Sequence, residues 1–185
     1  MYKLKIPQLV IGIEPDSRYF ERAQSVAEKL RRIVKSLATR VDIDVMGIDP
    51  VLDEKRLPRR IETVILPRTL HELLLLHKDD KTYLKKLARI VSQRQHSGDK
   101  VLVADPNYSV DIKTRTHRHL ITQAIRLIAD AYGHFHPLSE LPTPSDLIPV
   151  FKSAGYRLVE TAWKKNESTA LSQVVGAHFT VFEKE

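Results

Sequence analysis

The most informative chemistry of the sequence is a carboxylate, Glu14, that follows a short apolar run at residues 9–13. A carboxylate only accepts hydrogen bonds, so it can take the protons of both hydroxyls of a ribose. In nucleotide-binding α/β folds such an acid stands at the carboxyl end of the second strand. It follows the glycine-rich turn after the first strand by about 20 residues. Only residues 1–8 precede the apolar run here. We therefore expect the second half of a nucleotide site without its first half.

The elements that must position this acid alternate between strands and helices. Apolar, β-branched runs predict strands, and apolar residues recurring at threes and fours predict helices. The expected strands are residues 9–14, 41–45, 61–66, 100–105, 156–163 and 177–183, and the expected helices are residues 19–37, 80–91, 120–132 and 145–154, the last capped by Ser145 and Asp146. This alternation implies a parallel sheet with right-handed crossovers. The last two strands have only a loop between them, which implies an antiparallel hairpin.

The composition is that of a soluble globular protein. Apolar residues make up 42% of the 185 positions and charged residues 29%, both ordinary for one folded domain. We expect a single domain over residues 1–185. No apolar run approaches the roughly 20 residues that span a bilayer, and no signal pattern opens the sequence, so we expect a cytoplasmic protein. The absence of cysteine excludes disulfides, thiolate zinc sites and thiol catalysis.

The formal net charge of +7 points to acidic partners, nucleic acid among them. However, most basic residues alternate with apolar ones at helical spacing, which is typical of a solvated helix face. The two interpretations, solvated faces and a nucleic-acid surface, both stay open. The groups concerned are Lys29, Arg31, Arg32 and Lys35; Lys55, Arg56, Arg59 and Arg60; Lys85, Lys86 and Arg89; and Lys113, Arg115 and Arg118.

The order of these segments resembles the class I S-adenosylmethionine-dependent methyltransferases. IGIEPD at 11–16 resembles the family's second strand, and residues 41–49 resemble its third strand. VILPRTLHE at 64–72 resembles the fourth strand with the following loop, and GDKVLVADP at 98–106 resembles the fifth strand. KSAGY at 152–156 and GAHFTVF at 176–182 resemble the closing helix and hairpin. The resemblance covers nearly the whole chain. It implies a three-layer α/β/α, Rossmann-like methyltransferase sheet that is mostly parallel and ends in an antiparallel hairpin.

The resemblance also implies a cofactor, S-adenosylmethionine, and roles for several residues. Glu14 matches the ribose-binding acid, and Asp49 matches the loop acid that meets the adenine amino group. Arg68 and His71 lie in the loop that faces the methyl group, where His71 would be a general base for a protonated nucleophile. Three of these residues also have a purely structural interpretation. Glu14 would end a strand, Asp49 would start an Asp-Pro turn, and His71 would begin a helix.

Two further residues are candidates for the acceptor side of the site. Asp105 ends the expected strand 100–105, and Tyr108 lies just beyond it. The alternatives are an Asp-Pro turn for Asp105 and loop packing for Tyr108. Four histidines form two pairs, His117 with His119 and His134 with His136. No carboxylate-rich motif accompanies them, so we expect no metal site and a surface that gains positive charge below about pH 6.5.

The family's first motif, a strand followed by a Gly-x-Gly-x-Gly-like turn, has no counterpart in these residues. The six glycines are far apart: Gly12, Gly47, Gly98, Gly133, Gly155 and Gly176. Such a turn lets the backbone approach the methionine moiety of the cofactor without Cβ clashes. Three explanations stay open: an N-terminally truncated sequence, a degenerate non-enzymatic relative, or completion by another chain. Correspondingly, we expect either methyl transfer to an acceptor, with weak cofactor binding, or a non-catalytic module that binds RNA or a protein through its basic faces.

The missing strand would lie between the family's second and fourth strands, at the centre of the sheet. Its removal leaves a gap of roughly 9.6 Å, because strands lie about 4.8 Å apart. Such a gap exposes rows of backbone groups and does not stay open. We expect strand 9–14 to pair directly with strand 61–66 within one chain. The rival expectation is a dimer whose chains fill each other's gap.

Overall fold

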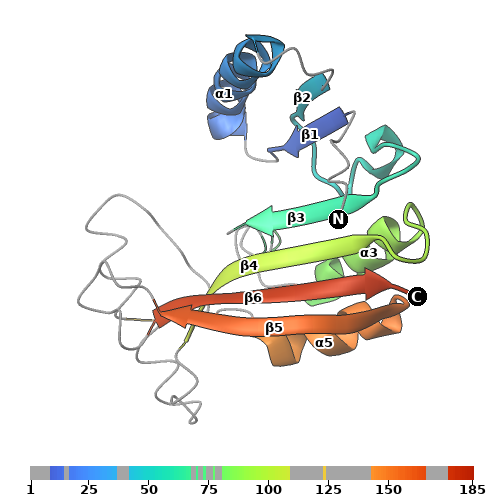
Figure 1. Ribbon diagram of the computed structural model, residues 1–185. Helices are drawn as coiled ribbons and strands as arrows, with labels where there is room; N and C mark the ends of the chain where they lie inside the picture. Colours follow the sequence, from blue (N-terminus) through green and yellow to red (C-terminus); the bar gives the residue numbers. More distant parts are fainter. Residues whose placement is uncertain are drawn as a thin grey trace, which may run out of the picture. The chain divides into compact units, whose positions relative to one another are not determined.

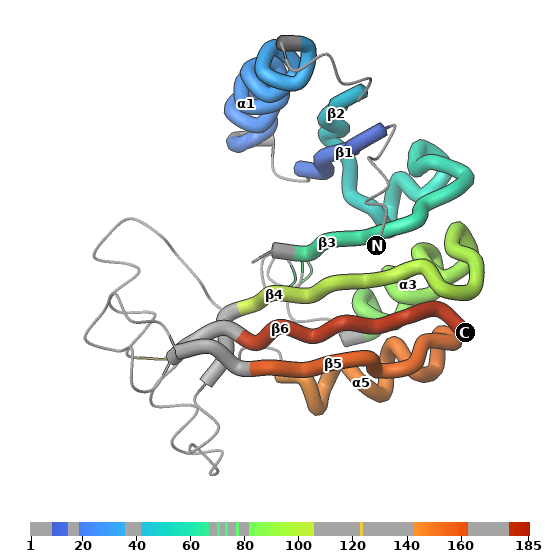
Figure 2. Tube along the Cα trace, in the orientation of Figure 1, coloured from blue at the N-terminus to red at the C-terminus, as the bar shows by residue number. Residues whose placement is uncertain are grey.

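A computed structural model describes residues 9–14, 17–36, 42–67, 70, 73, 77, 81–108, 123, 143–165 and 175–185 (Figures 1 and 2). The chain divides into two compact units, Met1–Leu57 and Pro58–Glu185. The first unit contains two strands, a long helix and a short 3-10 helix. The second contains four strands and the helices α3 and α5 among its described residues. Whether both units belong to one domain, as the sequence predicts, stays a prediction.

The first unit is a strand–helix–strand crossover. Strand β1 (Leu9–Ile13) pairs in parallel with β2 (Asp42–Met46), from Leu9 opposite Asp42 to Ile13 opposite Met46. Helix α1 (Ser17–Ser36) joins them and packs against β2. The 3-10 helix η1 (Glu54–Arg56) follows. The two strands and the helix expected from the sequence are confirmed, with ends within about two residues.

Helix α1 buries only one side of its apolar stripe. Ala27 is 3% exposed, whereas Val26, Leu30 and Ile33 are each about half exposed. The buried side meets β2 and the loop after it, where a Cβ at Gly47 would lie 3.1 Å from the ring of Phe20. The exposed apolar side is therefore available for a packing partner.

The second unit contains a four-stranded mixed sheet in the order β3-β4-β6-β5 (Figure 1). Strand β3 (Thr63–Pro67) pairs in parallel with β4 (Lys100–Tyr108). Strand β6 (Val175–Lys184) is antiparallel to both β4 and β5 (Tyr156–Lys165). The expected C-terminal hairpin is confirmed, and its last strand lies inside the sheet.

Two helices cover one face of this sheet, α3 (Lys81–Ser92) and α5 (Pro144–Ser153) (Figure 1). Alternate strand residues such as Val101, Val103 and Phe182 are buried at 1% exposure. The ring of Phe151 on α5 stacks on Phe182 with 4.4 Å between centroids, and meets Tyr156 edge-on at 5.6 Å. This aromatic cluster anchors α5 to the hairpin.

Two local expectations are wrong in detail. The N-cap of α5 is Thr143, not Ser145, since Asp146 accepts hydrogen bonds from the backbone N–H of Thr143 at 3.0 Å and from its hydroxyl at 2.7 Å. Strand β4 also does not end at Asp105. It continues through Pro106 to Tyr108 because β6 pairs along its whole length. An Asp-Pro turn at Asp105 is therefore excluded.

Some expectations concern residues that the structure does not describe, and one concerns the arrangement of the two units. The helix expected at 120–132 and the four paired histidines lie outside the described residues, except for residue 123. The described strands include no counterpart of the family's first strand. Direct pairing of β1 with β3 would join the two units and stays a prediction.

Candidate functional site

Glu14 lies at the carboxyl end of β1, where the sequence predicts a ribose-binding acid. Its backbone N–H donates to the carbonyl of Met46 at 3.1 Å, so the β1–β2 ladder holds this residue in place. The side chain is half-buried and lines a cavity of about 470 Å³ between α1 and the two strands. Most lining residues are apolar; Arg22 and Asp44 are the other charged ones. A cavity of this size is typical of small-molecule sites.

Asp49 follows β2 on the same carboxyl edge of the first unit. Its Oδ1 accepts hydrogen bonds from the backbone N–H groups of Val51 at 2.8 Å and Leu52 at 2.9 Å. Its own N–H donates to Oδ2 of Asp53 at 3.2 Å. These bonds are those of a turn residue, so the turn interpretation of Asp49 has direct structural support. An adenine contact stays a prediction.

A cofactor needs a close backbone approach as well as an acid, and the described glycines do not supply one in the first unit. A Cβ at Gly12 would make ordinary contacts, 3.4 Å to the side chain of Val45. A Cβ at Gly47 would meet Phe20, so that space is filled by the protein. The glycines of the first unit therefore provide no cradle for the amino-acid end of S-adenosylmethionine, and a contact of Glu14 with its ribose stays a prediction.

In the second unit the structure places Asp105 inside the sheet, directly opposite His178 on β6. Both are buried, with 0% and 1% exposure. Nδ1 of His178 lies 3.1 Å from the hydroxyl of Thr180, which lies 3.2 Å from that of Thr161. Nε2 of His178 has no hydrogen-bond partner among the described residues. Asp105 is thus part of a buried polar cluster.

Burial lowers the pKa of His178 below its ordinary value, and the negative charge of Asp105 partly opposes that shift. A neutral imidazole is therefore the stable form in the folded protein. Sequence reasoning missed this cluster. The signal was the alternation of His178, Thr180 and Phe182, which places all three on the buried face of a strand.

The remaining predicted site residues cannot be placed beside these. Arg68 and His71 lie outside the described residues. Tyr108 is the last residue of β4, with its backbone opposite Val175. Their roles on the methyl and acceptor sides stay predictions.

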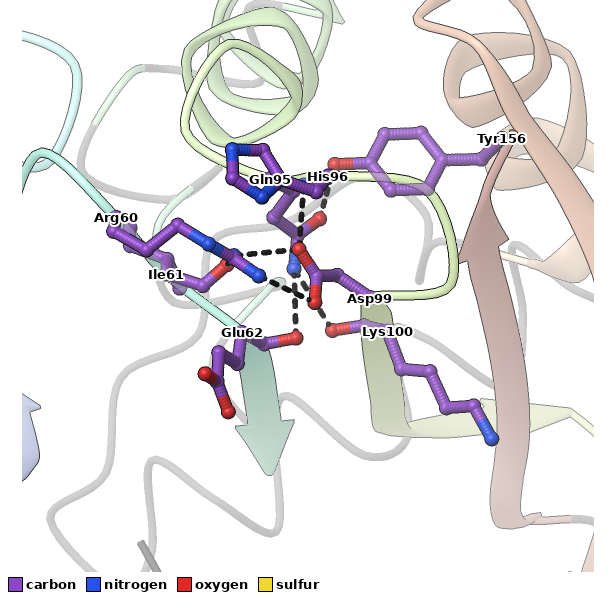
Figure 3. Close-up of polar contacts among 8 residues, drawn as sticks. All are labelled: Arg60, Ile61, Glu62, Gln95, His96, Asp99, Lys100 and Tyr156. Carbon is purple, nitrogen blue, oxygen red and sulfur yellow. Dashed lines mark hydrogen bonds and ion pairs between the residues drawn. The ribbon is translucent and has the colours of Figure 1, made fainter. Parts of the chain in front are cut away.

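A second polar cluster joins the amino ends of β3 and β4 (Figure 3). Arg60 binds the carboxylate of Asp99 through two nitrogens, at 2.5 and 2.9 Å, and the N–H of His96 donates to the same carboxylate at 2.5 Å. Burial alone would raise the pKa of Asp99, but these hydrogen bonds and the Arg60 charge lower it below its usual range. Asp99 thereby fixes the turn into β4.

Gln95 completes this cluster as a buried connector. Its amide nitrogen donates to the carbonyl of Lys100 at 3.1 Å, and more weakly to that of Glu62 at 3.4 Å. Its amide oxygen accepts from the hydroxyl of Tyr156 at 2.5 Å (Figure 3). Burial raises the pKa of Tyr156. Because the cluster lies at the amino ends of the strands, we interpret it as structural, since ligands of open α/β sheets bind at the carboxyl ends.

No helix among the described residues is long and apolar enough to cross a membrane. No group of three or more potential metal ligands is present in the same residues.

Solved structures resemble the chain although its sequence matches no protein-family model and no curated protein. One is an S-adenosylmethionine-dependent methyltransferase from Methanosarcina mazei, with a TM-score of 0.61 and 10% identity over 95% of this chain and 82% of that one. A second is the N-methyltransferase NodS from Bradyrhizobium japonicum WM9 in complex with S-adenosyl-L-homocysteine, with a TM-score of 0.55 and 11% identity over 95% of this chain and 76% of that one.

A third is the magnesium protoporphyrin IX methyltransferase of Synechocystis PCC 6803 with bound S-adenosyl-homocysteine. It has a TM-score of 0.55 and 11% identity over 96% of this chain and 64% of that one. All three likenesses extend over 95% or more of this chain. The chain therefore has the fold of the class I S-adenosylmethionine-dependent methyltransferases.

Proposed function

We propose that this chain is a methyltransferase-like protein that binds S-adenosylmethionine at the carboxyl edge of β1 and β2 and transfers its methyl group to an acceptor. The observation that carries the proposal is the position of Glu14, half-buried at the end of β1, in a fold shared with S-adenosylmethionine-dependent enzymes. The cytoplasmic location expected from the sequence belongs to the same proposal.

The bound cofactor would supply a methyl group on a sulfonium sulfur, and an aligned nucleophile would bond to that methyl carbon in line while the carbon–sulfur bond breaks and S-adenosylhomocysteine leaves. The residues of this chain would bind and orient. Glu14 would accept hydrogen bonds from the ribose hydroxyls, while the turn at Asp49 would border the adenine. Arg68 would contact the cofactor, and His71 would remove a proton from acceptors that carry one. Asp105 is buried opposite His178, so its proposed part is to support the acceptor side.

The cofactor should bind weakly to the 185-residue chain. The glycines described in the first unit provide no close backbone approach, so the described residues there hold no cradle for the amino-acid end of the cofactor. We expect a dissociation constant for S-adenosylhomocysteine above the low-micromolar range, that is, binding weaker than about −8 kcal/mol. Calorimetry measures this, with an NMR titration for weaker binding. Low-micromolar affinity would show that the cradle is not needed.

Removal of the Glu14 carboxylate tests the site directly. Glu14→Ala should weaken S-adenosylhomocysteine binding by about ten-fold or more, because hydrogen bonds to a charged group contribute about 1.5–3 kcal/mol. Asp42→Ala is the matched control, since Asp42 is an exposed carboxylate at the opposite end of the same two strands. Equal affinities of the wild type and Glu14→Ala would remove Glu14 from the site. No binding at millimolar ligand would favour the non-catalytic alternative.

A further inference from the structure

The exposed face of α3 carries three cations and no acid. Lys85, Lys86 and Arg89 are all exposed. The helix sequence, KTYLKKLARIVS, contains no aspartate or glutamate. Its large apolar residues are buried at 6% exposure or less, namely Tyr83, Leu84, Leu87, Ile90 and Val91. The helix thus presents an entirely polar, positively charged face.

These cations differ from Arg31 and Arg32 of α1 in their surroundings. On α1, Arg32 pairs with Glu28 at 2.6 Å and Arg31 lies 3.5 Å from Asp44. Within the part of the chain that the structure describes, Lys85, Lys86 and Arg89 have no ion pair. Their charge is therefore not neutralised by described neighbours.

Helix α5 extends this surface at one end. The two helices pack together, and the hydroxyl of Ser92 donates to the carbonyl of Ala154 at 2.7 Å, which joins their C-terminal ends. Lys152, near that end of α5, is exposed. The acid of α5, Asp146, lies at the other end of the helix and is bound to its cap residue. Arg89 and Lys152 therefore place a positive charge in the last turn of each helix, and the acid beside them, Glu185, hydrogen-bonds through its backbone to Gly155 just beyond α5.

We propose that α3 and the C-terminal end of α5 form a basic surface that binds the phosphate backbone of nucleic acid without sequence preference. Phosphates are the anions that clustered Lys and Arg side chains recognise in nucleic acid. The same surface does not suit a membrane, because an interfacial helix needs exposed apolar residues to insert. None of the exposed large apolar residues of the described chain lies on α3 or α5. The proposal is independent of methyl transfer.

Fluorescence anisotropy with the full chain tests the surface. The probes are a fluorescein-labelled single-stranded RNA of mixed sequence and the DNA of the same sequence. We expect micromolar or weaker binding, falling with salt. The variant Lys85→Glu, Lys86→Glu, Arg89→Glu should bind about ten-fold more weakly or worse. The slope of log affinity against log salt should decrease by about 2, because each of three phosphate contacts contributes about 0.7 for a single strand.

The matched control reverses three cations of α1: Lys29→Glu, Arg32→Glu, Lys35→Glu. It changes the net charge of the chain by the same amount, so it should retain most of the affinity. Circular dichroism establishes that both variants are folded. Equal losses in the two variants would overturn the proposal, because net charge alone would then explain binding. Absence of binding by the wild type would also overturn it, as would equally tight binding to phosphatidylserine vesicles or to polyglutamate.

Discussion

At the scale of single residues, His178 shows how burial determines the charge of a side chain. It lies opposite Asp105 in the β4–β6 ladder and is 1% exposed. Desolvation disfavours its protonated form, and the nearby carboxylate offsets only part of that effect. The folded protein therefore binds fewer protons at this site than the unfolded chain does.

This difference predicts an acid-sensitive fold. The unfolded pKa is about 6.5 and the folded pKa is lower, so stability is fully present above about pH 6.5 and decreases as pH falls towards the folded value. Between about pH 7 and 5, the free energy of unfolding in urea should decrease less for His178→Gln than for the wild type. The slopes of this free energy against pH are compared, because the substitution itself lowers stability.

Asp99 provides a control in a different pH window. Its folded pKa is lowered from 3.8, so its contribution is present above about pH 3.8 and lost only below that value. Asp99→Asn should therefore leave the slope between about pH 7 and 5 unchanged. Parallel slopes for the wild type and His178→Gln would show that the imidazole does not titrate in this range.

At the scale of elements, helix α5 depends on its first turn as well as on its core contacts. Leu147 and Phe151 are buried, and Thr143 and Asp146 form a reciprocal cap at the start. Such a cap satisfies backbone N–H groups that have no partner within the helix. The cap therefore stabilises the helix that covers the hairpin.

Thr143→Ala should lower the free energy of unfolding by about 1 kcal/mol, the usual contribution of an N-cap side chain. Ser153→Ala is the control, because the Ser153 hydroxyl is exposed at the other end of the helix and donates locally to Val150. It should change stability by less than about 0.5 kcal/mol. Urea unfolding measures both. Equal losses in the two variants would contradict the role given to the cap.

At the scale of the whole molecule, the described strands include no counterpart of the family's first strand, and the prediction concerns how β1 and β3 pair. Strands β1 and β3 are both apolar, and neither is suited to be an exposed edge. We predict that they pair directly within one chain. Such pairing would place Glu14 and the loop at residues 68–72 on the same carboxyl edge of one sheet.

Cysteine pairs test this pairing, because the chain has no native cysteine. Ile11→Cys is combined in turn with Val64→Cys, Ile65→Cys and Leu66→Cys. Adjacent strands lie about 4.8 Å apart, within reach of a disulfide. Oxidation should give a disulfide-linked monomer for at least one pair, seen by mass spectrometry of the non-reduced protein. A disulfide-linked dimer would favour the rival arrangement of two chains, and no disulfide in any pair would exclude direct pairing.

The sequence by itself determined the elements and their order. Periods of 2 and 3.6 in the apolar residues place β1, α1, β2, β3, α3 and the hairpin within about two residues, because both periods are local properties of the backbone. The Glu14 position follows from the same local pattern, since it directly continues an apolar strand. The motif order was sufficient to predict the methyltransferase fold that the solved structures confirm.

Only the tertiary structure decided which polar residues are buried together. Asp105 is 73 positions before His178, and Gln95 is 61 positions before Tyr156, so no local pattern relates the partners. The length of β4 depended on β6, which pairs with it for three residues beyond Asp105, where the sequence predicts the end of the strand. The cap of α5 likewise depended on the side-chain geometry of Thr143. Cross-strand register and desolvation are long-range properties, and they decided where strands end and which charges are stable.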